Sequence, residues 1–327
     1  MSKLTLKHGL RFEDLYDHDG LNRLDAVFRK ELAVAHAPLA LQLDEARANP
    51  DALAPKDEAE LLLAVAPYLE DFVGDLFGIG AEVRALAAKH NELAPLYACK
   101  RLFVQRRAAK ALKPDEVESL DGRELETELL AVLGISEFDE FAYARTIMGW
   151  LDDEVKNAAP LALAARYAAW ATLASAGRAH HKGSLLFHLP IKIDPIHLVH
   201  TTKEQQYGVT VLGLPEEQQR RREGFGLTDP RMTLPAALDH AHYCIYCHNQ
   251  GKDSCSKGLK DRKAGGFQKS AFGVPLAGCP LEERISEMNS LKADGHSIAA
   301  LAAVVVDNPM AAGTGHRICN DCMKACI

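Results

Sequence analysis

The sequence predicts a mainly α-helical protein in two parts, a long N-terminal helical domain and a shorter cysteine-rich helical domain. Apolar residues make up 47%, charged residues 25% and aromatic residues 6% of the 327 positions, which is typical of a helix-rich globular protein. Seven of the eight cysteines follow residue 243. Apolar side chains recur at the three-to-four spacing of a buried helical face in two sets, Leu24, Phe28 and Leu32, and Leu163, Tyr167 and Trp170.

Cysteine content and charge both indicate a domain boundary near residue 230. Only Cys99 lies in the first part. Residues 1–230 carry 27 basic and 36 acidic side chains, a net charge of −9, whereas residues 231–327 carry 11 and 9, a net charge of +2. A chain of this length is expected to hold two domains at roughly 150 residues each. We therefore predict a helical domain of unassigned role over 1–230 and a second domain over 231–327.

In the first part, proline and glycine separate successive helices. These breaks fall at Pro55, Gly78–Gly80, Lys113–Pro114, Gly134 and Pro160. The pattern changes near 185–214, where β-branched residues and prolines predict short extended segments packed on the helices. A polar linker rich in arginine then leads to the second part.

The second part is expected to hold a short helix ending at Tyr243, a cysteine-rich loop, and helices over about 281–292 and 297–306. The sequence Asp307-Asn308-Pro309 should end the last of these, because the residue before a proline is displaced from the helical region. A further group of cysteines follows this turn.

The spacing of the late cysteines predicts metal ligation. They are Cys244 and Cys247 in CIYC, Cys255, Cys279 followed by Pro280, and Cys319, Cys322 and Cys326 in CNDCMKAC. A two-residue gap lets both sulfurs face one metal centre and leaves backbone N–H groups to donate to sulfur. An iron–sulfur cluster is the favoured interpretation, and a pair of structural zinc sites in a helical binding module is the alternative.

Residues 231–327 resemble the α-helical two-cluster ferredoxin domain of the glutamate synthase small subunit and of dihydropyrimidine dehydrogenase. The order CxxC, third cysteine, Cys-Pro, Asp-Asn-Pro and a second cysteine group is the same. The resemblance implies one or two [4Fe–4S] clusters, the first on Cys244, Cys247 and Cys255 with a late cysteine, and the second on Cys279 with the remaining ones. The sequence departs from the family in the 23 residues between Cys255 and Cys279, and its seven cysteines leave two clusters one ligand short.

The same resemblance implies that electrons pass to a flavin in FAD- and NAD(P)-binding domains that follow in the same polypeptide. No GxGxxG motif between a strand and a helix is present in this sequence. We therefore expect a segment truncated at its C-terminus, part of a larger FAD/NAD(P)-dependent oxidoreductase, which relays electrons and is not catalytic alone.

Histidines gather in two places. His180, His181, His188, His197 and His200 are interpreted as surface or packed residues, and the alternative is a metal site in a helical enzyme. His240, His242 and His248 flank cluster ligands and are candidates for hydrogen bonds in the surroundings of sulfur.

Basic residues also cluster. Within the long insertion, Lys257, Lys260, Arg262, Lys263 and Lys269 oppose only Asp261, so this loop could dock an acidic electron-transfer partner or remain simply solvated. The run KRLFVQRRAAK at 100–110 and Arg220–Arg222 are interpreted as solvated helix faces, and Cys99 as a small buried residue.

The remaining features exclude several classes of protein. The net charge of −7 disfavours general nucleic-acid binding. The start of the sequence lacks the apolar core of a secretory signal, and no apolar run approaches the roughly 18 residues that span a bilayer. A cytoplasmic protein with reduced thiols and without a membrane segment is expected.

Overall fold

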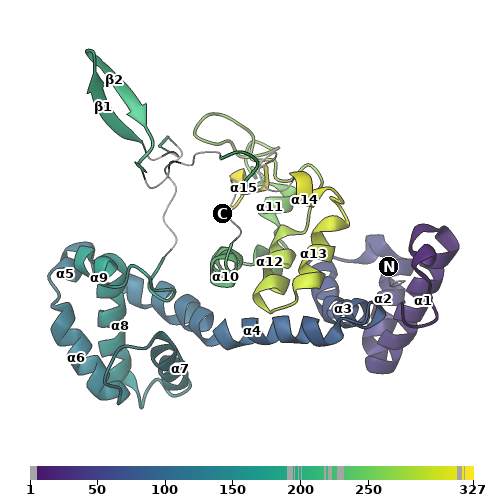
Figure 1. Cartoon of the computed structure of the whole chain (residues 1–327), viewed down its shortest axis with the longest axis horizontal. Helices are drawn as coiled ribbons and strands as arrows, with labels where there is room; N and C mark the ends of the chain where they lie inside the picture. The colour runs from purple at the N-terminus through teal and green to yellow at the C-terminus, as the bar shows by residue number, and fades with distance from the viewer. Residues whose placement is uncertain are drawn as a thin grey trace.

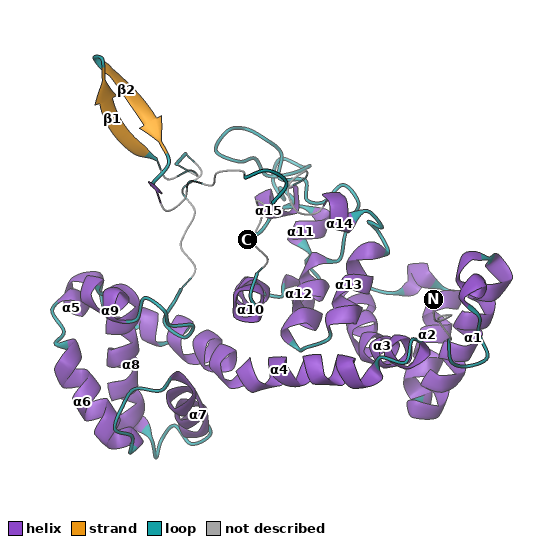
Figure 2. Cartoon of the chain, viewed as in Figure 1, coloured by secondary structure: helices purple, strands orange, loops and turns teal. Residues whose placement is uncertain are grey.

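The computed structural model describes residues 6–189, 194, 196–197, 199, 201–216, 219, 223–226, 232–314, 319 and 321–327. Helices account for most of this part of the chain, and its strands form one two-stranded sheet (Figure 2). The prediction of a mainly α-helical fold is therefore confirmed.

Three helices form a bundle at the N-terminal end, namely α1 (His18–Ala35), α2 (Ala37–Ala48) and α3 (Pro55–Leu76). Helix α1 begins where the side chain of Asp17 accepts the N–H of Gly20 at 2.7 Å. The rings of Phe28 on α1 and Phe72 on α3 lie 5.4 Å apart, and both belong to the apolar core that holds this bundle together.

The long helix α4 (Gly80–Cys99) leads from this bundle to a second one (Figure 1). A π-helical turn over Lys100–Gln105 extends it. The second bundle consists of α5 (Pro114–Glu118), α6 (Gly122–Leu133), α7 (Glu140–Leu151), α8 (Ala158–Leu173) and α9 (Ser175–His180). Its centre is the alanine-rich helix α8, where the buried hydroxyl of Tyr143 donates to the carbonyl of Ala164 at 3.0 Å.

The extended segments expected near 185–214 are present, but only their beginning packs on the helices. Leu186 and Phe187 are buried in the core of the second bundle. Strands β1 (Thr202–Gln206) and β2 (Val209–Gly213) form an antiparallel hairpin that projects away from the helices (Figure 1). Every residue of both strands is exposed, so the prediction that this part packs on the bundle is wrong. An isolated hairpin lacks a second layer against which to bury a face.

The cysteine-rich part is built from short helices. They are α10 (Leu234–Tyr243), α11 (Ser254–Lys257), α12 (Ile285–Ala293), α13 (Ser297–Val305), α14 (Ala311–Thr314) and α15 (Asp321–Lys324). Helices α10, α12 and α13 lie where the sequence predicts them, although α12 starts four residues later than expected. Helix α13 stops before Asp307-Asn308-Pro309, as predicted.

The cysteine-rich part packs against the first bundle through α3. Leu291 of α12 and Ala299 and Ala300 of α13 share an apolar core with Ala66 of α3. Glu70, 3% exposed, lies beside this core and accepts the backbone N–H groups of Ile298 at 2.7 Å and Ala299 at 3.0 Å. A side chain of α3 thus caps the start of α13, where unpaired N–H groups and the helix dipole favour an acid.

No helix in the described ranges combines the length and the apolar character needed to cross a lipid bilayer.

Replacing Glu70 tests this docking. Glu70→Ala should lower the free energy of unfolding in urea by about 1–3 kcal/mol, because two sheltered N–H groups lose their acceptor. Glu60→Ala on the same helix is the matched control, since Glu60 is exposed and its ion pair with Lys56, at 3.4 Å, lies on the surface of that helix. Its effect should stay within about 0.5 kcal/mol. Equal losses in the two variants would contradict the capping role.

Candidate metal centre

The CIYC sequence forms a tight turn that directs hydrogen bonds at sulfur. Tyr246 adopts a left-handed conformation, with φ of +54°, and its N–H donates to Cys244 Sγ at 3.4 Å. The hydroxyl of Ser286 on α12 lies 3.6 Å from the same sulfur and 2.6 Å from Nδ1 of the buried His248. The predicted contact between backbone N–H and sulfur is confirmed, and His248 approaches Cys244 through a serine that the sequence did not reveal.

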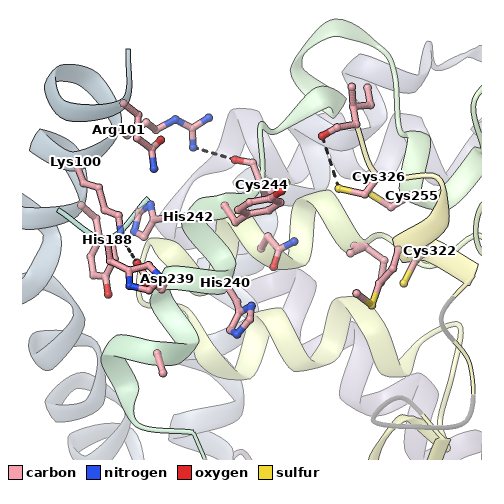
Figure 3. A pocket seen from close by; sticks show the side chains of 18 residues that line it. Lys100, Arg101, His188, Asp239, His240, His242, Cys244, Cys255, Cys322 and Cys326 are labelled. Carbon is pink, nitrogen blue, oxygen red and sulfur yellow. Dashed lines mark hydrogen bonds and ion pairs between the residues drawn. The ribbon is translucent and has the colours of Figure 1, made fainter. Parts of the chain in front are cut away.

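Three cysteines from separate segments meet beside this turn. The Cys255 thiol interacts directly with the thiols of Cys247 and Cys326, and Figure 3 shows Cys255 and Cys326 side by side. The interaction with Cys255 lowers the pKa of Cys247 and that of Cys326, while it raises the pKa of Cys255. The three thiols are therefore close enough to interact, and cysteine binds metals in its thiolate form.

The other three late cysteines gather separately. Cys322 lies near Cys279 and Cys319, and burial followed by the proximity of Cys279 raises the pKa of Cys322. Cys319 is exposed, whereas Cys279 and Cys322 are half-buried. Each group therefore combines a cysteine from the last nine residues of the sequence with at least one cysteine from residues 244–279. Cys99, by contrast, is fully buried in the second bundle, and burial raises its pKa to about 12, which confirms its interpretation as a packed residue.

The 23-residue insertion leaves the two cysteine groups in contact, because its ends return to one another. The N–H of Cys279 donates to the carbonyl of Cys255 at 2.8 Å. Between them the chain makes a small antiparallel excursion with bridges at Lys260–Phe267 and Lys269–Pro275. The 23 residues by which the sequence departs from the ferredoxin-like family therefore begin and end at adjacent backbone positions.

Two glycines allow the neck of the insertion to close. Gly258 and Gly278 have φ of +77° and +79°. A Cβ on Gly278 would lie 2.5 Å from the backbone nitrogen of Gly258 and 2.6 Å from the carbonyl of Ser256. Only glycine fits where the two backbones cross. Cys279 directly follows Gly278, and Cys255 lies three residues before Gly258, so both cysteines are close to the crossing.

A cavity of about 850 Å³ opens onto both cysteine groups. Cys244, Cys255 and Cys326 line it from the first group and Cys322 from the second. Its opposite wall comes from the end of α4, the π-helical turn and α10, and Figure 3 shows the labelled side chains facing one another across it. A space this large beside four thiols can accommodate a bulky inorganic group as well as solvent.

The helical part supplies the wall through residues that the sequence did not identify. Tyr97 donates to the carbonyl of Pro235 at 2.7 Å and stacks on His242 with ring centroids 4.4 Å apart. Lys100, only 4% exposed, pairs with Asp239 of α10 at 2.5 Å. Arg101 donates to the carbonyl of Cys244 at 3.1 Å and lies over the Tyr246 ring. The interpretation of this basic run as a solvated face is therefore wrong for Lys100 and Arg101, since the π-helical turn directs both toward the cysteine-rich part.

The histidines take several roles. His240, His242 and His188 line the cavity, and burial lowers the pKa of His242 to about 4, so that it is neutral. Inside the second bundle, Nε2 of His181 forms a hydrogen bond of 2.9 Å with the Tyr167 hydroxyl, as expected of a packed residue. His180 and His197 pair instead with Glu126 and Asp194. His200 and Arg220–Arg222 lie outside the described residues.

Within the described residues, no three histidine, cysteine or acidic side chains are arranged to hold a single metal ion. Thiolates are ligands of both zinc and iron–sulfur sites, and backbone N–H groups donate to sulfur in either kind of site. Thiols that line one cavity, with the N–H of Tyr246 directed at Cys244, therefore offer donors of the right chemical type for such a group.

Comparisons with known proteins add a family relationship. A family model described as the RP005 N-terminal alpha-helical domain matches residues 6–78, which contain α1, α2 and α3. The chain is also similar to a protein of Rickettsia prowazekii (strain Madrid E) named "Uncharacterized protein RP005", with 33% identity over 303 residues. That alignment covers 89% of this chain and 99% of the relative. No solved structure matches.

The glycine neck can be tested independently of any metal. Gly278→Ala should speed amide hydrogen exchange around Cys255 and Cys279 and cost about 1–3 kcal/mol, because the added Cβ forces the crossing chains apart. Gly265→Ala is the matched control, since Gly265 has a similar φ of +76° but nothing within 4 Å of its Cβ position. It should show backbone strain alone and leave exchange at the two cysteines unchanged. Unchanged exchange in Gly278→Ala would contradict the role of the neck.

Proposed function

We propose that this chain, which belongs to the RP005 family, is an iron–sulfur protein that relays single electrons. The observation that carries the proposal is the convergence of cysteines up to 82 positions apart, Cys244 to Cys326, on one cavity. Cysteines gathered in this way from several segments, without disulfides between them, are typical of a metal or cluster site.

The contacts support a division of the ligands into two sets. Cys244, Cys247, Cys255 and Cys326 would hold one [4Fe–4S] cluster, with Cys326 as the late cysteine that completes it. The interaction of Cys326 with Cys255 supports this choice. Cys279, Cys319 and Cys322 would form the second set, which has three thiols for a second cluster.

The surrounding residues would tune the first set. When bound, a [4Fe–4S] cluster accepts and releases one electron. The N–H of Tyr246 directs a positive dipole at Cys244, which favours the more negative, reduced state. The guanidinium of Arg101 adds a positive charge on the adjacent backbone. No acid–base chemistry is assigned to the chain. Because a relay only passes electrons on, it would need one partner to donate them and another to accept them.

The partners implied by the resemblance remain part of the proposal. Electrons would pass to a flavin of an FAD- and NAD(P)-dependent oxidoreductase. We assign the protein to the cytoplasm, where thiols stay reduced. The acidic net charge of the whole chain argues against nucleic acid as a partner.

Iron analysis of anaerobically reconstituted protein tests the proposal. The protein should be brown, its visible absorption should bleach on addition of dithionite, and Cys247→Ala should lose about half or more of the iron because one ligand set is broken. Cys99→Ala is the matched control, since Cys99 is a buried thiol outside both groups, and it should keep its full iron content.

The alternative function, a zinc-stabilised binding module, predicts a different outcome. A colourless protein that holds stoichiometric zinc and unfolds when a chelator removes it would favour that alternative. Iron content that is equally low in the wild-type protein and in Cys247→Ala after reconstitution would overturn the electron-transfer proposal.

A further inference from the structure

A second cavity, of about 460 Å³, lies between the base of the insertion and the first cysteine group. We call it the basic notch. Its cationic lining residues are Lys252, Lys257, Lys260, Arg262 and Arg284. The fold around the base of the insertion thus brings together positive side chains from positions 252 to 284, a stretch of 33 residues.

Most of the outer charges of the notch are not neutralised by neighbours in the described part of the chain. Lys252, Lys260 and Arg262 are exposed, and none of them forms an ion pair there. Lys260 instead lies 4.0 Å from the centroid of the Phe267 ring, which holds its ammonium group at the rim. Lys257 faces Glu282 at 4.0 Å, and Arg284 pairs with Glu58.

Two acids line the notch but lie beneath its rim. Glu287 is 1% exposed and faces Arg284 at 3.8 Å. Both carboxylate oxygens of Asp253 are shielded from solvent. The face that a partner meets is therefore positive, although the whole chain carries a net charge of −7.

The notch adjoins the first cysteine group. Ser254 and Ile327 also line it, and they are the chain neighbours of Cys255 and Cys326. The Cys326 thiol donates to the carbonyl of Ile327 at 3.9 Å. Since Ile327 lines the notch, one residue separates the notch from this thiol. A partner seated on the notch would approach the first ligand set more closely than one seated on either bundle.

We propose that the basic notch docks the acidic surface of a one-electron carrier protein. This inference rests on the proposed electron-transfer function and names the partner class and the face it uses. In each transfer the reduced carrier would lose one electron and become oxidised, and a cluster held by the first ligand set would gain that electron. No proton or atom is exchanged.

The shape of the surrounding surface favours a protein over a small anion. Two further exposed cations, Lys263 and Lys269, continue the positive charge along the insertion beyond the notch. Exposed apolar side chains follow at its tip, with Phe272 68% and Val274 46% exposed. A broad positive face with an apolar margin matches the composition of transient electron-transfer interfaces, in which charge steers the encounter.

Stopped-flow transfer from a reduced plant-type [2Fe–2S] ferredoxin, an acidic carrier, tests the proposal with the full chain after reconstitution. The triple variant Lys252→Glu, Lys260→Glu and Arg262→Glu should slow transfer about ten-fold or more at low ionic strength. Near 1 M salt, where the Debye length shrinks to about 3 Å, the difference from wild type should fall to about two-fold. The matched control reverses Lys89, Lys110 and Lys182, which are exposed on the helical part, and changes the net charge equally. It should reduce the rate by about two-fold or less.

Two further measurements separate the possible failures. Iron content shows whether the first ligand set is loaded, so loss of iron in wild-type protein would overturn the proposed function itself. Chemical-shift titration of isotope-labelled ferredoxin with the chain reports docking without electron transfer, and a Lys260→Gln, Arg262→Gln variant keeps this readout if the charge reversals unfold the insertion. Equal slowing by both triple variants, or docking to anionic vesicles but not to ferredoxin, would overturn the inference while leaving the iron–sulfur proposal in place.

Discussion

One hydrogen bond closes the arrangement of the candidate metal centre, from the N–H of Cys279 to the carbonyl of Cys255. It joins the end of the first cysteine run to the Cys-Pro that begins the next, across 23 residues of insertion. The crossing of Gly258 and Gly278 makes this bond possible, because any side chain there would force the backbones apart. Beyond the neck the chain forms an excursion with bridges at Lys260–Phe267 and Lys269–Pro275, and its basic side chains line the notch.

The helical part of the chain acts as a structural wall for the cysteine-rich part. Glu70 on α3 caps α13, while Tyr97 and Lys100 near the end of α4 hold α10 by a hydrogen bond and an ion pair. Buried charges of this kind are costly unless paired, so they specify one docking position as well as stabilising it. The acidic helical part and the mildly basic cysteine-rich part are thus joined by specific polar contacts around an apolar core.

Much of the fold could be predicted from the sequence, since helical periodicity and helix breaks are local properties. The buried face of α8, the end of α13 before Asp307 and the turn at CIYC all follow from neighbouring residues. The contacts of Lys100 and Arg101 could not be predicted, because they depend on a π-helical turn and on partners about 140 positions away. The exposure of the hairpin could not be predicted for a similar reason, because β-branched residues and prolines indicate extended segments but do not specify a layer to pack on. Likewise, spacing predicts the seven cysteines as candidate ligands but does not show which of them meet, and the contact of Cys326 with Cys255 depends on the fold.

Anomalous diffraction from anaerobically grown crystals, recorded on both sides of the iron absorption edge, would show whether these thiols surround iron. We expect a compact iron peak within the cavity bordered by Cys244, Cys255 and Cys326, too large for a single ion. A peak that appears only above the zinc edge, or thiols with no anomalous scatterer beside them in reconstituted protein, would exclude an iron–sulfur cluster there.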